Sequence, residues 1–201
     1  MSRLAQAFSV ACLSFGLCSS GCSSSDPAIA GEPSGGSGSP SGGAGAQASG
    51  SGMEPAALSG ITAAHNVARV AVQPAANPAI PVLIWNPDVA ATAQAWANRC
   101  AFEHRGGKYG ENIYASGGQD VTAAAVVASW VGEAKNYDYT DNACSGECGH
   151  YTQVVWRKSV RLGCGVAKCT ENSPFGAGFP EWQFVVCNYD PPGNFVGERP
   201  Y

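Results

Sequence analysis

The segment WQFVVCNY (residues 182–189) is rich in aromatic and β-branched residues, a composition typical of a β-strand. The segment LGCGV (residues 162–166) has the same character. HYTQVVW (residues 150–156) also reads as a strand with two faces. One face would carry His150, Thr152, Val154 and Trp156, and the other Tyr151, Gln153 and Val155. We therefore expect three strands in the last third of the chain, with His150 at the start of the first.

The sequence before these strands has the period of helices. A first helix is expected over about residues 56–72, and a second begins where Asn86 caps and Pro87 occupies the first helical position. Asp120 is expected to cap a third helix. The three apolar faces are, in order, Leu58, Ile61, His65, Ala68 and Val72; Val89, Ala93, Trp96 and Cys100; and Val121, Ala124, Ala128 and Val131. Helices followed by antiparallel strands indicate an α+β domain whose helices cover the sheet.

The composition argues against a nucleic-acid-binding protein and against a membrane-spanning helix. The 201 residues include only 11 Lys and Arg and carry a net charge of −4, so no basic face is available to bind nucleic acid. No run of eighteen apolar residues occurs, so the sequence predicts no transmembrane helix.

Residues 1–22 resemble an export signal of the lipoprotein type. Arg3 supplies the positive charge, residues 4–17 are mostly apolar, and Ser19-Ser20-Gly21-Cys22 resembles the lipobox of bacterial lipoproteins, in which the Cys is lipidated. The third residue before Cys22 is Ser rather than the usual Leu, and an ordinary signal peptide is the alternative. We expect an extracytoplasmic protein, either secreted or a cell-surface or outer-membrane lipoprotein whose lipid anchor is its sole membrane contact.

Residues 23–53 are mostly Gly, Ser, Ala and Pro, which bury too little apolar surface to fold, so we expect a disordered linker. Residues 54–201 are long enough for one compact domain. They contain six of the nine Cys, which in an exported protein indicates three disulfides. The spacings Cys144-x3-Cys148 and Cys164-x4-Cys169 also come near those of a zinc site, which is the rival interpretation.

One pairing follows from the strands, since Cys164 and Cys187 lie near the middles of two segments that can pair. Cys144 and Cys148 are four residues apart in a Gly-containing loop and are expected to close it. Elimination then leaves Cys100 with Cys169.

Four polar residues are candidates for chemistry: His104, Glu111, Glu133 and His150, with Glu111 in a Gly-flanked turn. Two neutral imidazoles can bind Zn²⁺, and either carboxylate can ligate the ion or act as a base. Their spacing matches no motif, so on spacing alone a hydrogen-bonded polar cluster is the favoured interpretation. His65 lies on the inner face of the first helix and is expected to be a core residue.

The chain contains several long, distinctive blocks: GENIY (110–114), GHYTQVVW (149–156) and CNYDPPGN (187–194), supported by His65-Asn66 with Arg69, AWANRC (95–100) and WVGE (130–133). These blocks closely resemble those of the CAP superfamily, also called the SCP domain, which includes cysteine-rich secretory proteins, insect antigen 5 and plant pathogenesis-related protein 1. The resemblance covers about residues 56–201 and is strongest to the pathogenesis-related branch.

The resemblance implies a three-layer α-β-α sandwich and the disulfides Cys100–Cys169, Cys164–Cys187 and Cys144–Cys148. It identifies His104, Glu111, Glu133 and His150 as the family's cavity residues, in which the two His hold zinc or another divalent metal in some members. Fold alone does not define function.

We favour a non-enzymatic binding module, with a lipid, a sterol, or a surface or host protein as partner. The alternative is a metal-dependent hydrolase or protease with Glu111 or Glu133 as base. A serine-protease variant lacks its nucleophile, because Arg105 stands where that proposal needs Ser. The tail from Pro191 resembles a segment that plant members release as a signalling peptide, but we favour the simpler interpretation that this tail packs against the domain.

Overall fold

A computed structural model describes residues 52–201. The predicted signal sequence (1–22), its Cys22 and nearly all of the predicted linker (23–53) lie outside these residues. The elements are η1 (Ala56–Leu58), α1 (Ile61–Val70), β1 (Ile84–Trp85), α2 (Pro87–Ala97), β2 (Gly110–Gly117), α3 (Ala123–Val131), η2 (Gly132–Asn136), β3 (Tyr137–Asp138), β4 (Ala143–Cys144), α4 (Gly149–Val154), β5 (Arg161–Cys169), η3 (Gly176–Gly178) and β6 (Trp182–Asp190). Within the described part, no helix is long and apolar enough to cross a bilayer.

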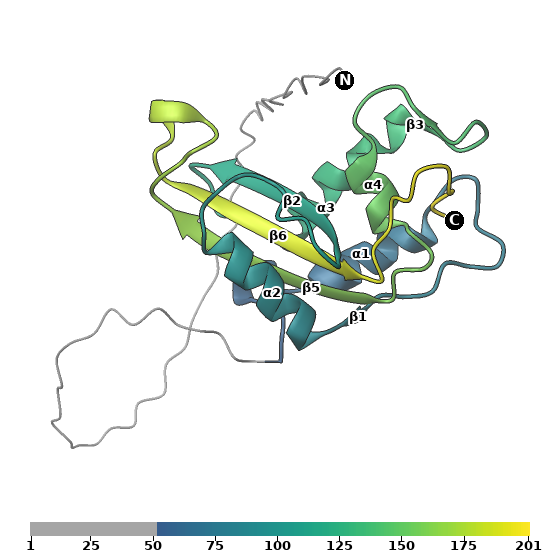
Figure 1. Ribbon diagram of the computed structural model, residues 1–201, viewed down its shortest axis with the longest axis horizontal. Helices are drawn as coiled ribbons and strands as arrows, with labels where there is room; N and C mark the ends of the chain where they lie inside the picture. Colours follow the sequence, from purple (N-terminus) through teal and green to yellow (C-terminus); the bar gives the residue numbers. More distant parts are fainter. Residues whose placement is uncertain (1–51) are drawn as a thin grey trace, which may run out of the picture. The chain divides into compact units, whose positions relative to one another are not determined.

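The described residues form the expected α-β-α sandwich, with a four-stranded sheet in the order β1-β5-β6-β2 as its middle layer. Strands β5 and β6 pair antiparallel, as do β6 and β2, whereas β1 adds to β5 in parallel. Helix α2 packs on one side of the sheet, and α1, α3 and α4 contact one another on the other side (Figure 1). A second, two-stranded sheet joins β3 and β4.

Alternation along β6 separates two apolar cores. Val185, Cys187 and Tyr189 belong to the core beneath α1, α3 and α4, whereas Phe184 and Val186 belong to the core beneath α2. On β5, a Cβ at Gly163 would overlap the backbone of α2 at Ala90. The glycines of the LGCGV segment therefore allow α2 to lie directly on the sheet.

The helix predictions are partly confirmed. The second helix begins as expected, since the Asn86 side chain accepts hydrogen bonds from the backbone N–H groups of Asp88 and Val89. The first is interrupted by Gly60, whose φ is +84°, so that 3₁₀ helix η1 precedes α1.

For the third helix, the predicted cap and the predicted face are both wrong. Thr122 caps α3, whereas Asp120 bonds to Gln183 and pairs with Lys168. The residues of α3 that are buried are Ala123, Val126, Val127 and Trp130, while Ala124 and Ala128 are exposed. Small apolar residues of α3 occur on all sides of the helix, so their spacing alone does not identify the buried face.

Two strand predictions are confirmed and one is wrong. The segments 162–166 and 182–189 lie within β5 and β6. In contrast, His150 does not open a strand, because Gly149–Val154 form helix α4. Glu111, expected in a turn, lies in β2, where it is paired in register with Asn188.

The six cysteines of the domain form the disulfides Cys100–Cys169, Cys144–Cys148 and Cys164–Cys187, which confirms the pairings and removes the alternative of a cysteine zinc site. Cys164 and Cys187 lie directly opposite each other on β5 and β6, with Cα atoms 4.1 Å apart. The C-terminal segment packs against the domain: the Tyr201 ring stacks on Tyr139 at 4.7 Å.

Candidate functional site

His104 and Glu111 form the first of two histidine–carboxylate pairs. His104 lies in the loop after α2, and Glu111 is the second residue of β2. The Glu111 Oε1 atom accepts hydrogen bonds from His104 Nδ1, at 2.9 Å, and from the backbone N–H of Arg105, at 3.0 Å. The Glu111 side chain is only 8% exposed and the His104 ring is 57% exposed. A nearly buried carboxylate thus orients an imidazole at the surface.

His150 and Glu133 form the second pair, at the N-terminus of α4. Glu133, in η2, accepts from His150 Nδ1 through Oε1 at 2.6 Å. Its Oε2 accepts from the backbone N–H groups of His150 and Tyr151, at 2.9 and 3.3 Å. These are N–H groups of the first helical turn, which have no partner inside the helix. Glu133 therefore caps the N-terminus of α4 and also orients the imidazole of His150, which can ligate a metal.

The two imidazoles lie close together, with ring centroids 6.4 Å apart and planes inclined by 31°. Each Nδ1 faces a carboxylate oxygen, which can only accept, so each Nδ1 carries the hydrogen. In the neutral rings this leaves a lone pair on both Nε2 atoms. A carboxylate behind Nδ1 is the usual second-shell arrangement of a metal-binding histidine. The donor set therefore fits a divalent metal ion.

Two observations limit the site. Within residues 52–201, no three His, Cys, Asp or Glu side chains are grouped as metal ligands. With Zn–N bonds of about 2.0–2.1 Å in a tetrahedral arrangement, two imidazoles on one ion have centroids about 5 Å apart. The pair at 6.4 Å must therefore close by about an ångström, and water or a bound ligand must complete the coordination.

Trp130 supports His150 from beneath. The indole is 2% exposed and stacks on the His150 ring at 6.2 Å with planes 17° apart. Its Nε1 donates to the Ile113 carbonyl of β2, which holds the ring in place. The imidazole is thus fixed by a carboxylate at its edge and an aromatic plane on its face.

A buried chain of hydrogen bonds connects this site to α1. The Nδ1 of His65 faces the Ile61 carbonyl at 2.7 Å and must donate, so its Nε2 accepts from the Tyr189 hydroxyl at 2.8 Å. Burial lowers the pKa of His65 to about 4 and raises that of Tyr189 well above its usual range, so both side chains are neutral. Asn112 donates to the Tyr189 oxygen and to the His150 carbonyl, each at 3.0 Å.

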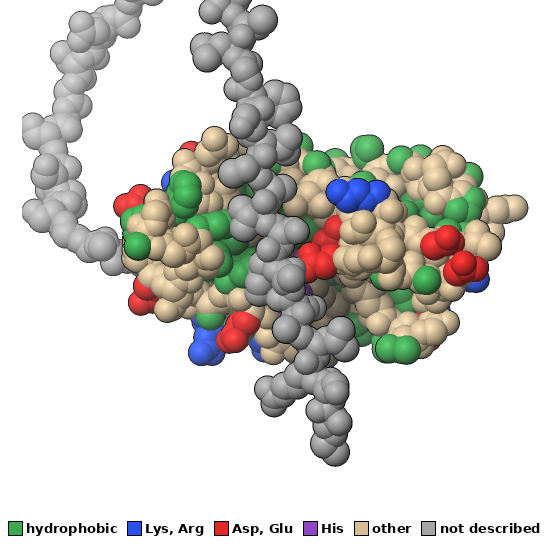
Figure 2. Space-filling model, turned by 90° about the horizontal axis from the view of Figure 1, so that it is seen from above, with side chains coloured by type: hydrophobic (Ala, Val, Ile, Leu, Met, Phe, Trp, Pro, Cys, Tyr) green, Lys and Arg blue, Asp and Glu red, His purple; other side chains and the backbone are tan. Residues whose placement is uncertain are grey.

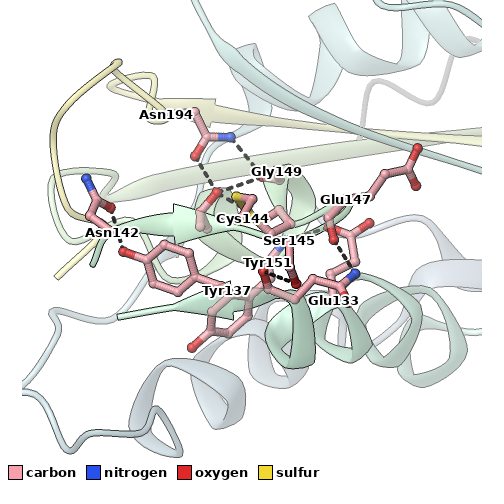
Figure 3. Close-up of a disulfide and its surroundings, with 12 residues drawn as sticks. Glu133, Tyr137, Asn142, Cys144, Ser145, Glu147, Gly149, Tyr151 and Asn194 are labelled. Atoms are coloured by element: carbon pink, nitrogen blue, oxygen red, sulfur yellow. Dashed lines mark hydrogen bonds between the residues drawn. A yellow bond between two sulfur atoms is a disulfide. The ribbon is translucent and has the colours of Figure 1, made fainter. Parts of the chain in front are cut away.

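Helix α4 is also held at its side and at its C-terminus. From the C-terminal segment, Asn194 donates to the Gly149 carbonyl at 2.8 Å and accepts from Thr152 Oγ1 at 2.8 Å (Figure 3). At the other end, the buried Arg69 guanidinium donates to the carbonyls of Val154 and Trp156, at 2.9 and 3.0 Å. The position of His150 thus depends on α1, η2 and the tail.

The structure therefore brings all four predicted site residues into one cluster, His104, Glu111, Glu133 and His150, which we term the His–Glu cluster. His65 is fully buried, as expected of a core residue. The sequence reasoning gave no role to Asn112, Trp130 or Tyr189, although each lies in a block quoted above. The side chains that they contact come from distant segments, so local patterns did not reveal them.

Comparison with known proteins adds a family assignment. The sequence model of the Cysteine-rich secretory protein family (CAP) matches residues 62–189. Pathogenesis-related protein 1 of Arabidopsis thaliana is 44% identical over 141 residues, covering 68% of this chain and 78% of the relative. The basic form of pathogenesis-related protein 1 of Nicotiana tabacum is 46% identical over 144 residues, covering 68% of this chain and 71% of the relative.

Solved structures agree with the fold. Venom allergen-like protein 4 of Schistosoma mansoni is 28% identical with a TM-score of 0.58, over 73% of this chain and 94% of that chain. The structure of NaASP2 with Zn²⁺ is 29% identical with a TM-score of 0.60, over 78% of this chain and 90% of that chain.

Proposed function

The chain belongs to the CAP family of cysteine-rich secretory proteins, in its pathogenesis-related branch, and on that basis we propose that it is an extracytoplasmic, non-enzymatic binding module with a divalent metal site at His104 and His150. Zinc is the expected ion. The family is one of secretory proteins, and the three disulfides suit an oxidising compartment. Export through residues 1–22, and lipidation of Cys22, remain part of this proposal.

The observation that carries the metal proposal is the matched pair of histidine–carboxylate hydrogen bonds. Both Nδ1 atoms are bonded to carboxylates, which leaves both Nε2 atoms as ligands. NaASP2, a structural neighbour, was solved with Zn²⁺. A bound ion at this place can link a ligand to the protein or act as a Lewis acid.

The same contacts favour binding over catalysis. Both oxygens of Glu133 are bonded, one to the His150 ring and the other to the first amides of α4. Glu111 supports His104 and the Arg105 amide through one oxygen. A general base must be free to take a proton from water. Glu133 uses both of its oxygens, and Glu111 one of its two, to hold a histidine and nearby amides. This leaves Glu133 poorly placed to act as a base and disfavours the hydrolase that the sequence left open.

A lipid or sterol partner is proposed for a different place. A groove of about 860 Å³ lies between the segment before α1, the end of β1 and the start of α2. Its lining includes Met53, Pro55, Trp85, Pro87 and Ala90. Ligand sites of this size are commonly lined by apolar side chains. A surface or host protein is the remaining candidate partner.

The test is native mass spectrometry of the full chain as the expressing cell processes it, first as purified and then after addition of zinc. We expect one zinc ion per chain, lost in His104→Ala and in His150→Ala. The matched control is His65→Gln, which removes the third histidine of the chain; the His65 ring is bonded to Ile61 and Tyr189 and is not a ligand, so the variant should still bind the ion once thermal unfolding shows that it folds. Uptake unchanged in both site variants contradicts the metal proposal.

The same spectra address the other parts of the proposal. The mass of the processed chain shows whether it begins near residue 22 and whether Cys22 carries lipid. A copurified lipid mass that persists in both histidine variants supports the groove as a separate site. Zinc-dependent hydrolysis of a peptide or ester, lost in Glu111→Gln, would instead favour the enzyme.

A further inference from the structure

Two arginines and a tryptophan line one shallow groove on the outer face of α2. The groove has a volume of about 440 Å³ and is formed by Ala91, Thr92, Ala95, Trp96, Arg99 and Arg105. Among the α-helices of residues 52–201, only α2 packs on this side of the sheet (Figure 1), and Ala91 and Ala95 on its outer face and Arg99 just beyond its end are exposed. The chain has only 11 Lys and Arg, and on the face shown in Figure 2 they form small separate groups. Two guanidinium groups in one groove are therefore a concentration of positive charge.

Neither arginine has a carboxylate partner among residues 52–201. The five ion pairs of this part of the chain involve other residues, and neither guanidinium donates a hydrogen bond within it. By contrast, Arg161 pairs with Asp190, and Arg157 and Arg199 bond to backbone carbonyls. Arg99 and Arg105 thus present their donors to solvent. A guanidinium is a fork of N–H donors that matches a carboxylate.

The groove is also held in shape. The Arg99 guanidinium lies over the Trp96 ring, 5.1 Å from its centroid. Trp96 Nε1 donates to the Glu103 carbonyl at 2.9 Å, which fixes the indole against the loop. The Arg105 amide is bonded to Glu111 at 3.0 Å. Both arginines therefore project from anchored positions, which lowers the entropy lost when a ligand binds.

The other lining residues indicate what kind of molecule would carry a carboxylate into this groove. Ala91 and Ala95 add apolar methyl groups to the lining, and Trp96 adds an aromatic side chain, over one face of which the Arg99 guanidinium lies. Thr92 Oγ1 donates to the Asp88 carbonyl at 3.1 Å and so keeps its lone pairs to accept from a hydroxyl. A sugar ring has one apolar C–H face and several hydroxyls, which matches these surfaces. The volume suits roughly one or two rings.

We propose that this groove binds an acidic saccharide, with a uronate carboxylate between Arg99 and Arg105 and the sugar ring against Trp96. The site lies on the α2 face and needs no metal, although it adjoins the His–Glu cluster through the bond from the Arg105 amide to Glu111. The single acidic residue of the adjoining loop, Glu103, is exposed and would weaken binding through charge repulsion.

The experiment is calorimetric titration of the purified full chain, with a chelator present, using digalacturonate and its neutral methyl ester. We expect digalacturonate to bind and the ester to bind at least tenfold more weakly. Arg99→Gln and Arg105→Gln should each weaken binding about threefold to fivefold, as for exposed ion pairs. Glu103→Gln should strengthen binding.

The matched control is Lys108→Gln, which removes an equal charge from the same loop, where Lys108 lies over the Tyr109 ring and outside the groove. It should change affinity less than twofold. Equal binding of acid and ester, or equal losses in Lys108→Gln and the arginine variants, overturns the proposal. If inorganic phosphate competes as well as digalacturonate does, the groove is a general anion site and the saccharide assignment is wrong. All variants change exposed side chains, and thermal unfolding checks that they fold.

Discussion

Arg69 is a buried cation that pairs with no carboxylate in the described part of the chain, and its replacement provides a demanding test of this fold. The side chain is 1% exposed. It donates four hydrogen bonds at 2.9–3.0 Å, to the carbonyls of Pro81, Val154, Trp156 and Ser159. Burial lowers its pKa to about 10, so the group is still charged at neutral pH. The guanidinium therefore satisfies the C-terminal end of α4 and the turn that leads into β5.

We expect Arg69→Met to reduce the free energy of unfolding by about 3–5 kcal/mol. Hydrogen bonds from a charged donor contribute about 1.5–3 kcal/mol each, and four would give about 6–12 kcal/mol. Such sums exceed measured effects because neighbouring contributions are not additive. Breaking a buried charged contact costs about 3–5 kcal/mol, and Met fills most of the space that is vacated. For about 150 residues this lowers Tm by roughly 6–20 °C.

The assay is urea unfolding followed by tryptophan fluorescence, with calorimetry for Tm and the disulfides kept intact. The control is Arg157→Met, because the Arg157 guanidinium also donates to two carbonyls, those of Pro78 and Ala79, but closer to the surface. That variant should lose less than about 1 kcal/mol. Equal losses in the two variants, or a loss below about 1 kcal/mol in Arg69→Met, would refute the reasoning.

Three further predictions follow from local contacts. Because His65 has a pKa of about 4 in the folded state against about 6.5 when unfolded, the unfolded chain takes up the extra proton first as the pH falls. Stability should therefore decrease by up to about 3 kcal/mol between pH 6.5 and pH 4, a slope absent from urea titrations of His65→Gln. Gly163→Ala should cost about 3 kcal/mol, because its Cβ would overlap the Ala90 backbone. The control Gly178→Ala meets nothing within 4 Å and should leave Tm unchanged. Asn86→Ala should cost about 1 kcal/mol in the same unfolding assay, through loss of the α2 cap.

The parts of the fold that the sequence predicted are those whose signal is local. β6 is buried at every position except Asp190, and most of its residues are apolar, because both of its faces are covered. Helix α2 has its own cap and a first-turn proline. For α3, in contrast, small apolar residues occur on all sides, and the buried face is decided by where Trp130 fits.

The error at α4 has a specific cause. Residues 150–154 include Tyr, Thr and Val, which favour strands, and a six-residue helix is too short to be stable alone. The structure compensates with contacts from distant residues. Glu133, 17 residues away, binds the first amides, and Arg69, 85 residues away, binds the last carbonyls. A window of adjacent residues contains neither partner, so periodicity alone favoured the strand.

The same contacts explain why the two halves of the proposed metal site differ. His150 is fixed by Glu133 and Trp130, and its backbone by Asn112. His104 lies in a loop, is 57% exposed and is bonded to one carboxylate. The approach of about an ångström that a tetrahedral ion requires must therefore come from His104 rather than from His150. Metal affinity should depend on how readily the loop after α2 shifts, and the sequence contains no pattern that reports this.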